Sequence, residues 1–318
     1  MNPPRNAPPV AVDSAALDAI LGGAEPGVAP AVSAVVWRRG VEIYARAPDR
    51  VFDLASLTKP LCTAELANRA VAAGALALDG GHPRLPDGVT VRHLLQHAAG
   101  YPAWRPLWEV GDRDTIYAAA IETPRVTAPG AAHTYSDLGF LALGAVLEAV
   151  GGARLDALFA PYAGALRWGN PLAEPTFCFE RNAVITGTVH DRNAAAMGGV
   201  APHAGLFGTA RDVATCAARW LDGTVPGASA SFTARGPGSH ALGWDTPSPG
   251  GGSSAGPRPP ADAVGHLGFT GTAVWMAPSA GLLAVLLTNR VRNGPDLAGV
   301  RALRPAFFQA VWDGAGRA

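Results

Sequence analysis

Hydrophobic and β-branched residues are concentrated in four short runs near the two ends of the chain. Residues 31–38 (AVSAVVWR) and 41–46 (VEIYAR) flank the Arg-Gly pair at 39–40, a pattern that predicts a β-hairpin. Residues 272–278 (TAVWMAP) and 281–291 (GLLAVLLTNRV) predict a second pair of strands around a Pro-Ser-Ala-Gly turn. The strands therefore come from opposite ends of the sequence.

Between these strands, and after the last of them, apolar residues recur at helical spacing. The pattern predicts helices over about 56–73, 91–98, 138–151 and 210–223, separated by loops rich in proline and glycine. A closing helix is predicted over about 298–313. Its apolar side consists of Leu303, Phe307, Phe308 and Val311.

These elements predict an α/β chain of the α+β kind, in which distant strands form one antiparallel sheet covered by the terminal helix. Residues 1–55 and 224–318 would form the sheet lobe, and residues 56–223 a mainly helical lobe. Residues 224–262 are the part richest in glycine, proline and serine, which predicts a long surface loop. The cleft between the lobes is the natural place for a ligand.

Composition narrows the classes of function. Of 318 residues, 48% are hydrophobic and 16% are charged, which excludes a disordered chain. Twenty-five basic and 25 acidic residues give a net charge of zero, and no basic stripe predicts binding to nucleic acid or anionic lipid. We expect small-molecule partners, with no nucleic acid and no membrane. The pattern does not predict an oligomeric state.

Two further features bear on the compartment. The N-terminal stretch has two Pro-Pro pairs and no continuous apolar core, so a secretory signal is not expected, and no apolar run reaches the roughly 18 residues of a membrane-spanning helix. The three cysteines, Cys62, Cys178 and Cys216, are too few and too widely spaced for a disulfide framework or a zinc finger. Buried reduced thiols in a cytoplasmic protein are the expectation.

The position of the single lysine is the strongest chemical signal. Of the 25 basic residues 24 are arginine, and the exception, Lys59, stands three positions after Ser56. Positions i and i+3 share one face of a helix, and a serine hydroxyl needs a neighbouring base to become a nucleophile. Lysine is such a base when burial and positive surroundings lower its pKa towards neutrality. The alternative is a helix N-cap with a surface lysine, and Pro60 is unfavourable inside a helix.

Two further motifs carry polar chemistry. Tyr135-Ser136-Asp137 offers a phenol that could carry protons between nucleophile and leaving group when it lies near two cations. The alternative is a helix start, in which Ser136 or Asp137 caps the helix that follows. The segment 265–272 (GHLGFTGT) precedes a predicted strand, and its glycines could expose amides for an oxyanion hole or simply begin the strand.

These three motifs, in this order, resemble the serine β-lactamase-like family, which includes class C β-lactamases, DD-peptidases and related esterases. Within the family, the supporting segments are most similar to penicillin-binding-protein-4B-like and esterase-like members. The resemblance covers about 30–310. The supporting segments are LLQHAAGY (94–101), VHDRNAAAMGGVAPHAGLFGTARDVA (189–214), GWDTPSPGG (243–251) and GHLGFTGTAVWMAP (265–278).

The resemblance implies a β-lactamase/transpeptidase-like fold and a set of catalytic roles. Ser56 would be the acylated nucleophile, Lys59 its base or proton partner, and Tyr135 the tyrosine of a Y-x-N-type motif. The backbone amides of Ser56 and Phe269 would form the oxyanion hole. No metal and no organic cofactor is implied.

This sequence differs from the family's motifs at three positions. Asp137 stands where the family usually has asparagine, His266 where the K-T-G lysine stands, and Leu267 where that motif has threonine, whereas Gly268 keeps the motif's glycine. All three changes argue against tight recognition of a β-lactam or D-alanine carboxylate. They favour an ester, amide or thioester that lacks this group.

Several other patterns are explained more simply by structural roles than by catalysis or metal binding. Residues 252–256 (GSSAG) match the G-x-S-x-G elbow but lie in a Pro/Gly-rich stretch, without the strand and helix that the elbow needs. His97 is expected to be hydrogen-bonded near a helix end rather than to bind metal with His93. The His190-Asp191 pair is expected to anchor a loop near the cleft, and Pro202 argues against a role for His203. Tyr101, Trp104 and Trp108 form an aromatic cluster that could belong to the core or to the acyl pocket.

The function predicted from these features is that of a serine hydrolase, an esterase or amidase working through an acyl-enzyme on Ser56. An acyltransferase on the same fold is one alternative, and a β-lactamase or DD-carboxypeptidase is another. A catalytically silent binding protein would be expected to have a broken Ser/Lys/Tyr set, and a metal-dependent hydrolase would lose activity on chelation.

Overall fold

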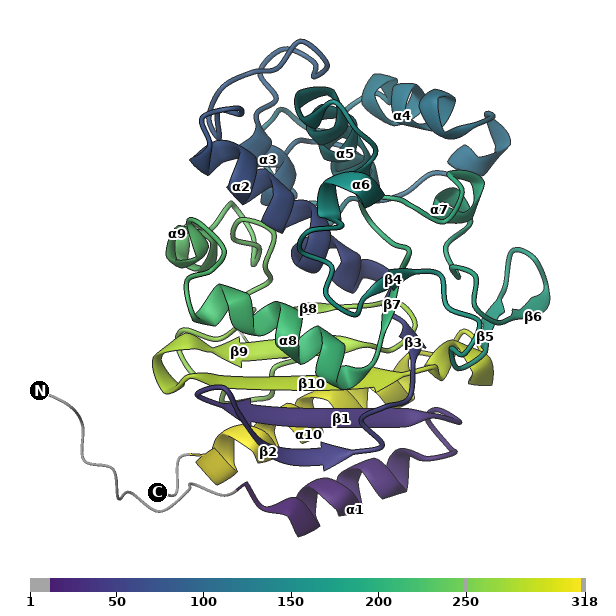
Figure 1. Cartoon of the computed structure of the whole chain (residues 1–318), viewed down its shortest axis with the longest axis vertical. Coiled ribbons are helices and arrows are strands. Elements are labelled where there is room, and N and C mark those ends of the chain that lie inside the picture. Colours follow the sequence, from purple (N-terminus) through teal and green to yellow (C-terminus); the bar gives the residue numbers. More distant parts are fainter. Residues whose placement is uncertain (1–11, 249–250, 316–318) are drawn as a thin grey trace, which may run out of the picture.

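The predicted antiparallel sheet is present, and both of its hairpins are confirmed. The computed structural model describes residues 12–248 and 251–315, and within them five strands pair in the order β2-β1-β10-β9-β8 (Figure 1). Arg39 and Gly40 both have positive φ, 50° and 79°, as the tight turn between β1 and β2 requires. The strands are β1 (Val32–Arg38), β2 (Val41–Arg46), β8 (Val264–Leu267), β9 (Ala273–Ala277) and β10 (Leu282–Thr288).

Helices cover both faces of this sheet (Figure 1). On one face α1 (Ser14–Ala24) and the predicted terminal helix α10 (Ala298–Ala315) pack on Ala284 and Leu286, and the other face carries α8 (Ala210–Leu221). Burial on both faces explains why all seven residues of β10 are apolar or buried rather than alternating. The apolar side predicted for α10 is confirmed as buried. The helix α1 was not predicted, because its small residues carry a weak helical pattern.

The central strand gives a direct test of this packing. Leu286 of β10 is fully buried in the cluster formed with the two terminal helices, so we expect Leu286→Ala to lower the free energy of unfolding by about 2–5 kcal/mol. Val41 on the edge strand β2 is 63% exposed, and Val41→Ala is the matched control with little expected effect. Urea denaturation measures both, and equal effects would contradict the packing described.

The middle of the chain forms the helical part above the sheet, together with two small sheets (Figure 1). The predicted helices at 138–151 and 210–223 are confirmed as α5 and α8, whereas that at 91–98 ends at Leu95, shortly before His97 turns to a positive φ of 54°. The helices are α2 (Glu65–Ala72), α3 (Val91–Leu95), α4 (Arg113–Glu122), α5 (Asp137–Gly151), α6 (Leu155–Phe159) and α7 (Arg192–Ala196). The small sheets are β3 (Phe52–Asp53) with β7 (Leu206–Gly208) and β4 (Arg167–Trp168), and β5 (Thr176–Cys178) with β6 (Ala183–Ile185).

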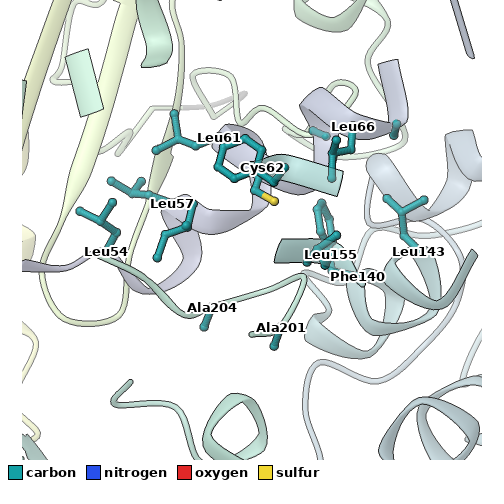
Figure 2. Close-up of a cluster of buried hydrophobic side chains, with 14 of the residues drawn as sticks. Leu54, Leu57, Leu61, Cys62, Leu66, Phe140, Leu143, Leu155, Ala201 and Ala204 are labelled. Carbon is teal, nitrogen blue, oxygen red and sulfur yellow. The ribbon is translucent and has the colours of Figure 1, made fainter. Parts of the chain in front are cut away.

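The continuous helix predicted over 56–73 is wrong in detail. A 3₁₀ turn at Ala55–Leu57 leads into a π-helix at Lys59–Ala64, and only then does α2 begin. Pro60 lies in the first turn of this π-helix, where its missing N–H costs little. The segment is nevertheless fixed, because Leu57, Leu61 and Cys62 are fully buried in the same hydrophobic core as Phe140 of α5 and Leu155 of α6 (Figure 2).

The segment 224–262 is not simply a surface loop. It contains the short helix α9 (Ala228–Thr233), and it buries Trp244 and Ala255 completely. Glycine and proline predicted its irregular backbone correctly, but composition alone does not show that a segment packs inward. Residues 249–250, within this segment, lie outside the described part of the chain.

Four remaining expectations concern the cysteines, membrane spanning, a secretory signal and the division into lobes. Cys62, Cys178 and Cys216 are free and buried, as predicted. Among the helices of residues 12–248 and 251–315, none combines the length and apolarity needed to span a bilayer. Residues 1–11, on which the expectation about a secretory signal partly rests, lie outside the described residues. The two-lobe division of the chain stays a prediction.

Candidate active site

The backbone before Ser56 is held in an unusual conformation. Ala55 has a φ of 48°, a left-handed value that is rare for a residue with a Cβ. Its N–H donates to Asp53 Oδ1 at 2.8 Å, while the other carboxylate oxygen accepts from the His190 N–H at 2.7 Å. Burial raises the pKa of Asp53, although these two amides act in the opposite direction. The arrangement presents Ser56, which is half-buried, at the surface of a cleft.

Ser56, Lys59 and Asp137 form one connected polar group. The Lys59 ammonium donates to Ser56 Oγ at 2.8 Å and lies 2.7 Å from Asp137 Oδ1. The Lys59 side chain is fully buried, and it also donates to the backbone oxygen of His203 at 3.4 Å. The structure thus brings together the serine and the lysine of the first motif and the aspartate of the second.

The expectation that the pKa of Lys59 falls towards neutrality is wrong. Burial does disfavour the ammonium, but the Asp137 carboxylate and the Tyr135 phenol outweigh it, so the pKa of Lys59 lies above its ordinary value. The resting lysine is therefore charged and paired. Asp137, which stands where the family usually has asparagine, is the larger of the two groups that raise this pKa.

Tyr135 lies beside this pair, but with one cation as neighbour rather than two. Lys59 Nζ is 4.8 Å from the centre of the Tyr135 ring. Burial raises the pKa of the Tyr135 phenol, with Lys59 opposing, so the phenol is protonated at neutral pH. The His266 ring also lies near Tyr135, with ring centres 5.9 Å apart, but burial and Lys59 lower the pKa of His266 to about 3, so it is not a second cation.

The start of α5 places Asp137. Ser136 is the N-cap, since its Oγ accepts from the Gly139 N–H at 3.1 Å and donates to the Pro102 oxygen at 2.7 Å. The Ser136 N–H donates to His97 Nδ1 at 3.0 Å. The helix-start interpretation of this motif is confirmed, with Ser136 rather than Asp137 as the cap. His97 is hydrogen-bonded, as expected.

The loop between β8 and β9 packs closely against the segment before Ser56. Thr272 Oγ1 donates to the Leu54 oxygen at 3.0 Å, and Thr270 Oγ1 donates to the Asp53 oxygen at 2.8 Å. A Cβ at position 268 would lie 2.7 Å from the Leu54 oxygen and would collide with Thr272 Oγ1, so only glycine fits there. His266 lies within the edge strand β8, not in the loop before a strand.

Two buried arginines, which the sequence pattern did not single out, hold this loop. Arg304 of α10 donates to the backbone oxygens of Gly268 and Thr272 at 2.7 and 2.9 Å, and Arg290 donates twice to the Phe269 oxygen. Burial, with a contribution from Arg290, lowers the pKa of Arg304 to about 9. The Phe269 N–H has no acceptor among the described residues. The sequence feature that could have identified Arg304 is its position among the apolar residues of the terminal helix.

A cleft of about 930 Å³ joins these groups. Lys59 lies behind Ser56, and the other predicted site residues line the cleft. Of the aromatic cluster, Trp104 and Trp108 line it with ring centres 5.3 Å apart, whereas Tyr101 is buried in the core and donates to the Ile121 oxygen. The predicted site residues along the cleft are Ser56, Tyr135, Asp137, His266, Gly268 and Phe269.

His190 and Asp191 are anchors, as expected, and Asp191 also pairs with His203, which the sequence did not predict to take part. Asp191 accepts from the Ala194 N–H at the start of α7 and lies 3.0 Å from His203 Nε2. Although burial acts in the opposite direction, His203 and this amide lower the pKa of Asp191 to about 2. The sequence does not predict this pair, because Asp191 and His203 are 12 positions apart and no short motif links them.

The other discounted motifs have structural roles. Ser253 accepts the Ala255 N–H, and Ser254 accepts from the Trp275 indole, with neither strand nor helix immediately around them. His93 accepts from the Thr90 N–H in the cap of α3.

Two groups of side chains in the described residues could hold a metal ion by the spacing of their ligand atoms. One consists of Asp137, Asp191 and His203, and the other of His97, His240 and His266, with ligand atoms within 4.8 Å in each. In the first group Lys59 already neutralises Asp137, which makes it a poor cation site.

Comparison with known proteins is consistent across sequence and structure. A family model described as Beta-lactamase matches residues 19–306. The N-acetylmuramyl-L-alanine amidase of Bacillus subtilis (strain 168) is 29% identical over 304 residues, covering 76% of this chain and 68% of that protein. A beta-lactamase structure from Mycobacterium bovis matches with a TM-score of 0.69 at 24% identity, covering 94% of this chain and 99% of that one. The structure of EstCE1, a hydrolase with promiscuous acyltransferase activity, matches with a TM-score of 0.67 at 20% identity, covering 92% and 98%.

Proposed function

The chain belongs to the beta-lactamase family, and on that premise we propose that it is a serine hydrolase acting through a covalent acyl-enzyme on Ser56. One observation carries the proposal: the only lysine of the chain donates to Ser56 Oγ at 2.8 Å while it is paired with Asp137. A buried charged lysine would be costly as a mere structural element, because its desolvation must be offset by partners. A half-buried serine hydrogen-bonded to a lysine is the arrangement expected of a nucleophile and the group that takes its proton.

The charged state of Lys59 determines how the proton moves. An ammonium cannot accept a proton, so Lys59 passes one to Asp137 as it takes the hydroxyl proton of Ser56. Ser56 Oγ then bonds to the substrate carbonyl carbon. When the bond to the leaving alcohol or amine breaks, the Tyr135 phenol supplies the proton and recovers one from Lys59, which in turn takes back the proton held by Asp137, so the resting ion pair is restored. Water repeats the sequence on the acyl-enzyme and releases the acid.

The developing negative charge needs donors that are already in place. We assign this role to the backbone amides of Ser56 and Phe269, which line the same cleft. Arg290 and Arg304 bind the carbonyl oxygens of this loop and so fix the orientation of its peptide groups. In this account both arginines position the oxyanion hole and do not bind substrate.

The lining favours an uncharged ester or amide. His266 is neutral, Leu267 is apolar, and Asp137 adds a negative charge close to the nucleophile. Trp104 and Trp108 also line the cleft. An acyl group lying on these indoles would be apolar, and a carboxylate beside Asp137 would be repelled. An acyltransferase shares every step up to the acyl-enzyme and differs only in the group that accepts the acyl chain.

Turnover of p-nitrophenyl butyrate, measured beside penicillin and in the presence of a chelator, tests the proposal. We expect ester hydrolysis that the chelator leaves unchanged, with neither hydrolysis of penicillin nor a stable penicillin adduct. Hydrolysis of penicillin would instead favour the β-lactamase branch, and product that requires an added alcohol would favour the acyltransferase. Loss of activity on chelation would contradict the mechanism.

Asp137→Asn distinguishes the proton relay from direct base catalysis by lysine. In the variant Lys59 has no carboxylate to receive its proton and must lose it to solvent, while Tyr135 still acts to raise the pKa of Lys59, so we expect kcat/KM at pH 7 to fall by about tenfold or more and to recover as pH rises. If Lys59 were a free amine base in the native protein, removal of Asp137 would lower its pKa and raise activity at pH 7. The pH profile of kcat/KM separates the two outcomes.

A further inference from the structure

Three histidine rings from distant parts of the chain converge beside Tyr135. His97 follows α3, His240 lies in the segment after α9, and His266 is in β8. One ring nitrogen of each lies within 4.8 Å of a ring nitrogen of each of the others. Their exposed fractions are 3%, 7% and 2%, yet His240 and His266 line the cleft together with Ser56.

The hydrogen bonds of His97 fix its proton. Its Nδ1 accepts the Ser136 N–H, so in the neutral ring the proton is on Nε2. His97 Nε2 is buried and has no partner in the part of the chain that the structure describes. His97 therefore holds an N–H donor that no described protein group satisfies.

His266 has the opposite arrangement. Its Nδ1 lies 2.9 Å from the Leu267 oxygen and must donate to it, which leaves a lone pair on Nε2. That Nε2 is also buried and unpartnered within residues 12–248 and 251–315. His266 therefore holds an acceptor. His240 completes the group, with its Nδ1 engaged 3.0 Å from His133 Nε2.

The rings are uncharged at neutral pH. Burial, with the mutual effect of neighbouring histidines and of Lys59, lowers the pKa of His97 and of His240 far below its usual range, and that of His266 to about 3. A donor and an acceptor held side by side match a group that both accepts and donates one hydrogen bond. A carboxylate has no proton for His266, and an ammonium has no lone pair for His97.

The spacing of the nitrogens fits the same group. They lie within 4.8 Å of one another, and an oxygen equidistant from three nitrogens at that upper limit would be about 2.8 Å from each, a normal hydrogen-bond length. The rings also surround Tyr135, with centres 4.4, 5.6 and 5.9 Å from that of the tyrosine. The histidine cluster is therefore next to the residue that protonates the leaving group in the proposed mechanism.

We propose that His97, His240 and His266 form a pocket for a hydroxyl group on the alcohol side of the substrate. The inference rests on the proposed function and deepens it. The preferred substrates are then esters of diols or polyols, which carry a free hydroxyl close to the scissile bond. By microscopic reversibility the same pocket selects a diol over a simple alcohol as acyl acceptor.

A metal ion is the other ligand that three histidines suggest, and the proton on His97 argues against it. Ligation through Nε2 would put the proton on Nδ1, where it would face the Ser136 N–H. Two donors would then oppose each other at the cap of α5. The hydroxyl needs no such rearrangement.

The test compares two esters of similar shape, 2-hydroxyethyl butyrate and propyl butyrate. We expect the native protein to favour the hydroxyethyl ester by at least about tenfold in kcat/KM, because the propyl ester leaves buried polar nitrogens unpaired. His240→Leu should reduce this preference at least about fivefold. His82→Leu is the matched control, since His82 is outside the cleft, and the preference should persist.

Phosphonate labelling of Ser56 in each variant shows that the protein is folded and its nucleophile reactive. A native preference below twofold, or a preference unchanged by His240→Leu, would overturn the inference while leaving the hydrolase intact. Stoichiometric zinc binding that His240→Leu abolishes would also overturn it, in favour of a metal site. If the protein neither hydrolyses an ester nor labels at Ser56, the proposed function itself fails, and the inference with it.

Discussion

Ser56→Ala is expected to reduce ester turnover by at least about 10⁴-fold, because no acyl-enzyme can form without the hydroxyl. The residual rate would come from substrate binding and the oxyanion donors. Stability should change little, since Ser56 Oγ makes its one described hydrogen bond with Lys59, which keeps Asp137 as its partner. Steady-state hydrolysis of p-nitrophenyl butyrate measures the effect.

The matched control for this variant is Ser254→Ala. Ser254 is the central serine of the G-x-S-x-G match, and it accepts a hydrogen bond from Trp275. We expect its replacement to leave turnover within about threefold of the native rate. Loss of activity in Ser254→Ala, with retention in Ser56→Ala, would move the nucleophile to residues 252–256 and refute the mechanism.

Lys59→Arg is expected to lower kcat/KM by roughly 10³-fold, the contribution of one positioned acid–base group. Arginine keeps the charge that pairs with Asp137, but it does not give up its proton, so the relay is broken. The larger guanidinium must also enter a fully buried position. Kinetics on the same ester, with circular dichroism to follow folding, measure this prediction.

A double variant separates catalysis from stability at this position. Lys59→Met alone leaves Asp137 without its cation, and breaking such a buried pair costs about 3–5 kcal/mol. Lys59→Met combined with Asp137→Asn removes both charges, so much of that stability should return while activity stays absent. A double variant that regained activity would show that Lys59 is structural.

The sequence identified the chemistry best where the relevant residues are close together. Ser56 and Lys59 are three positions apart, and with one lysine in the chain the pair stands out. The strands and the closing helix followed from apolar runs, because their burial on the sheet is a local pattern. The π-helix after Lys59 did not follow, since the periodicity of small apolar residues does not separate it from an α-helix.

What the sequence did not predict are properties that depend on tertiary neighbours. The pKa of Lys59 depends on Asp137, 78 positions later, and the expectation of a lowered value failed for that reason. His97, His240 and His266 meet only because β8, α3 and the segment after α9 border one cleft. No spacing rule links them, and neither does one link Arg304 to the loop that it holds.

The assignment of Ser56 as nucleophile is the claim on which the other roles depend. Intact mass after incubation with a fluorophosphonate tests it most directly, followed by mapping of the modified peptide. The account predicts one adduct per chain, located on Ser56, and no adduct on Ser56→Ala. An unmodified folded native protein, or an equal adduct on Ser56→Ala, would contradict it.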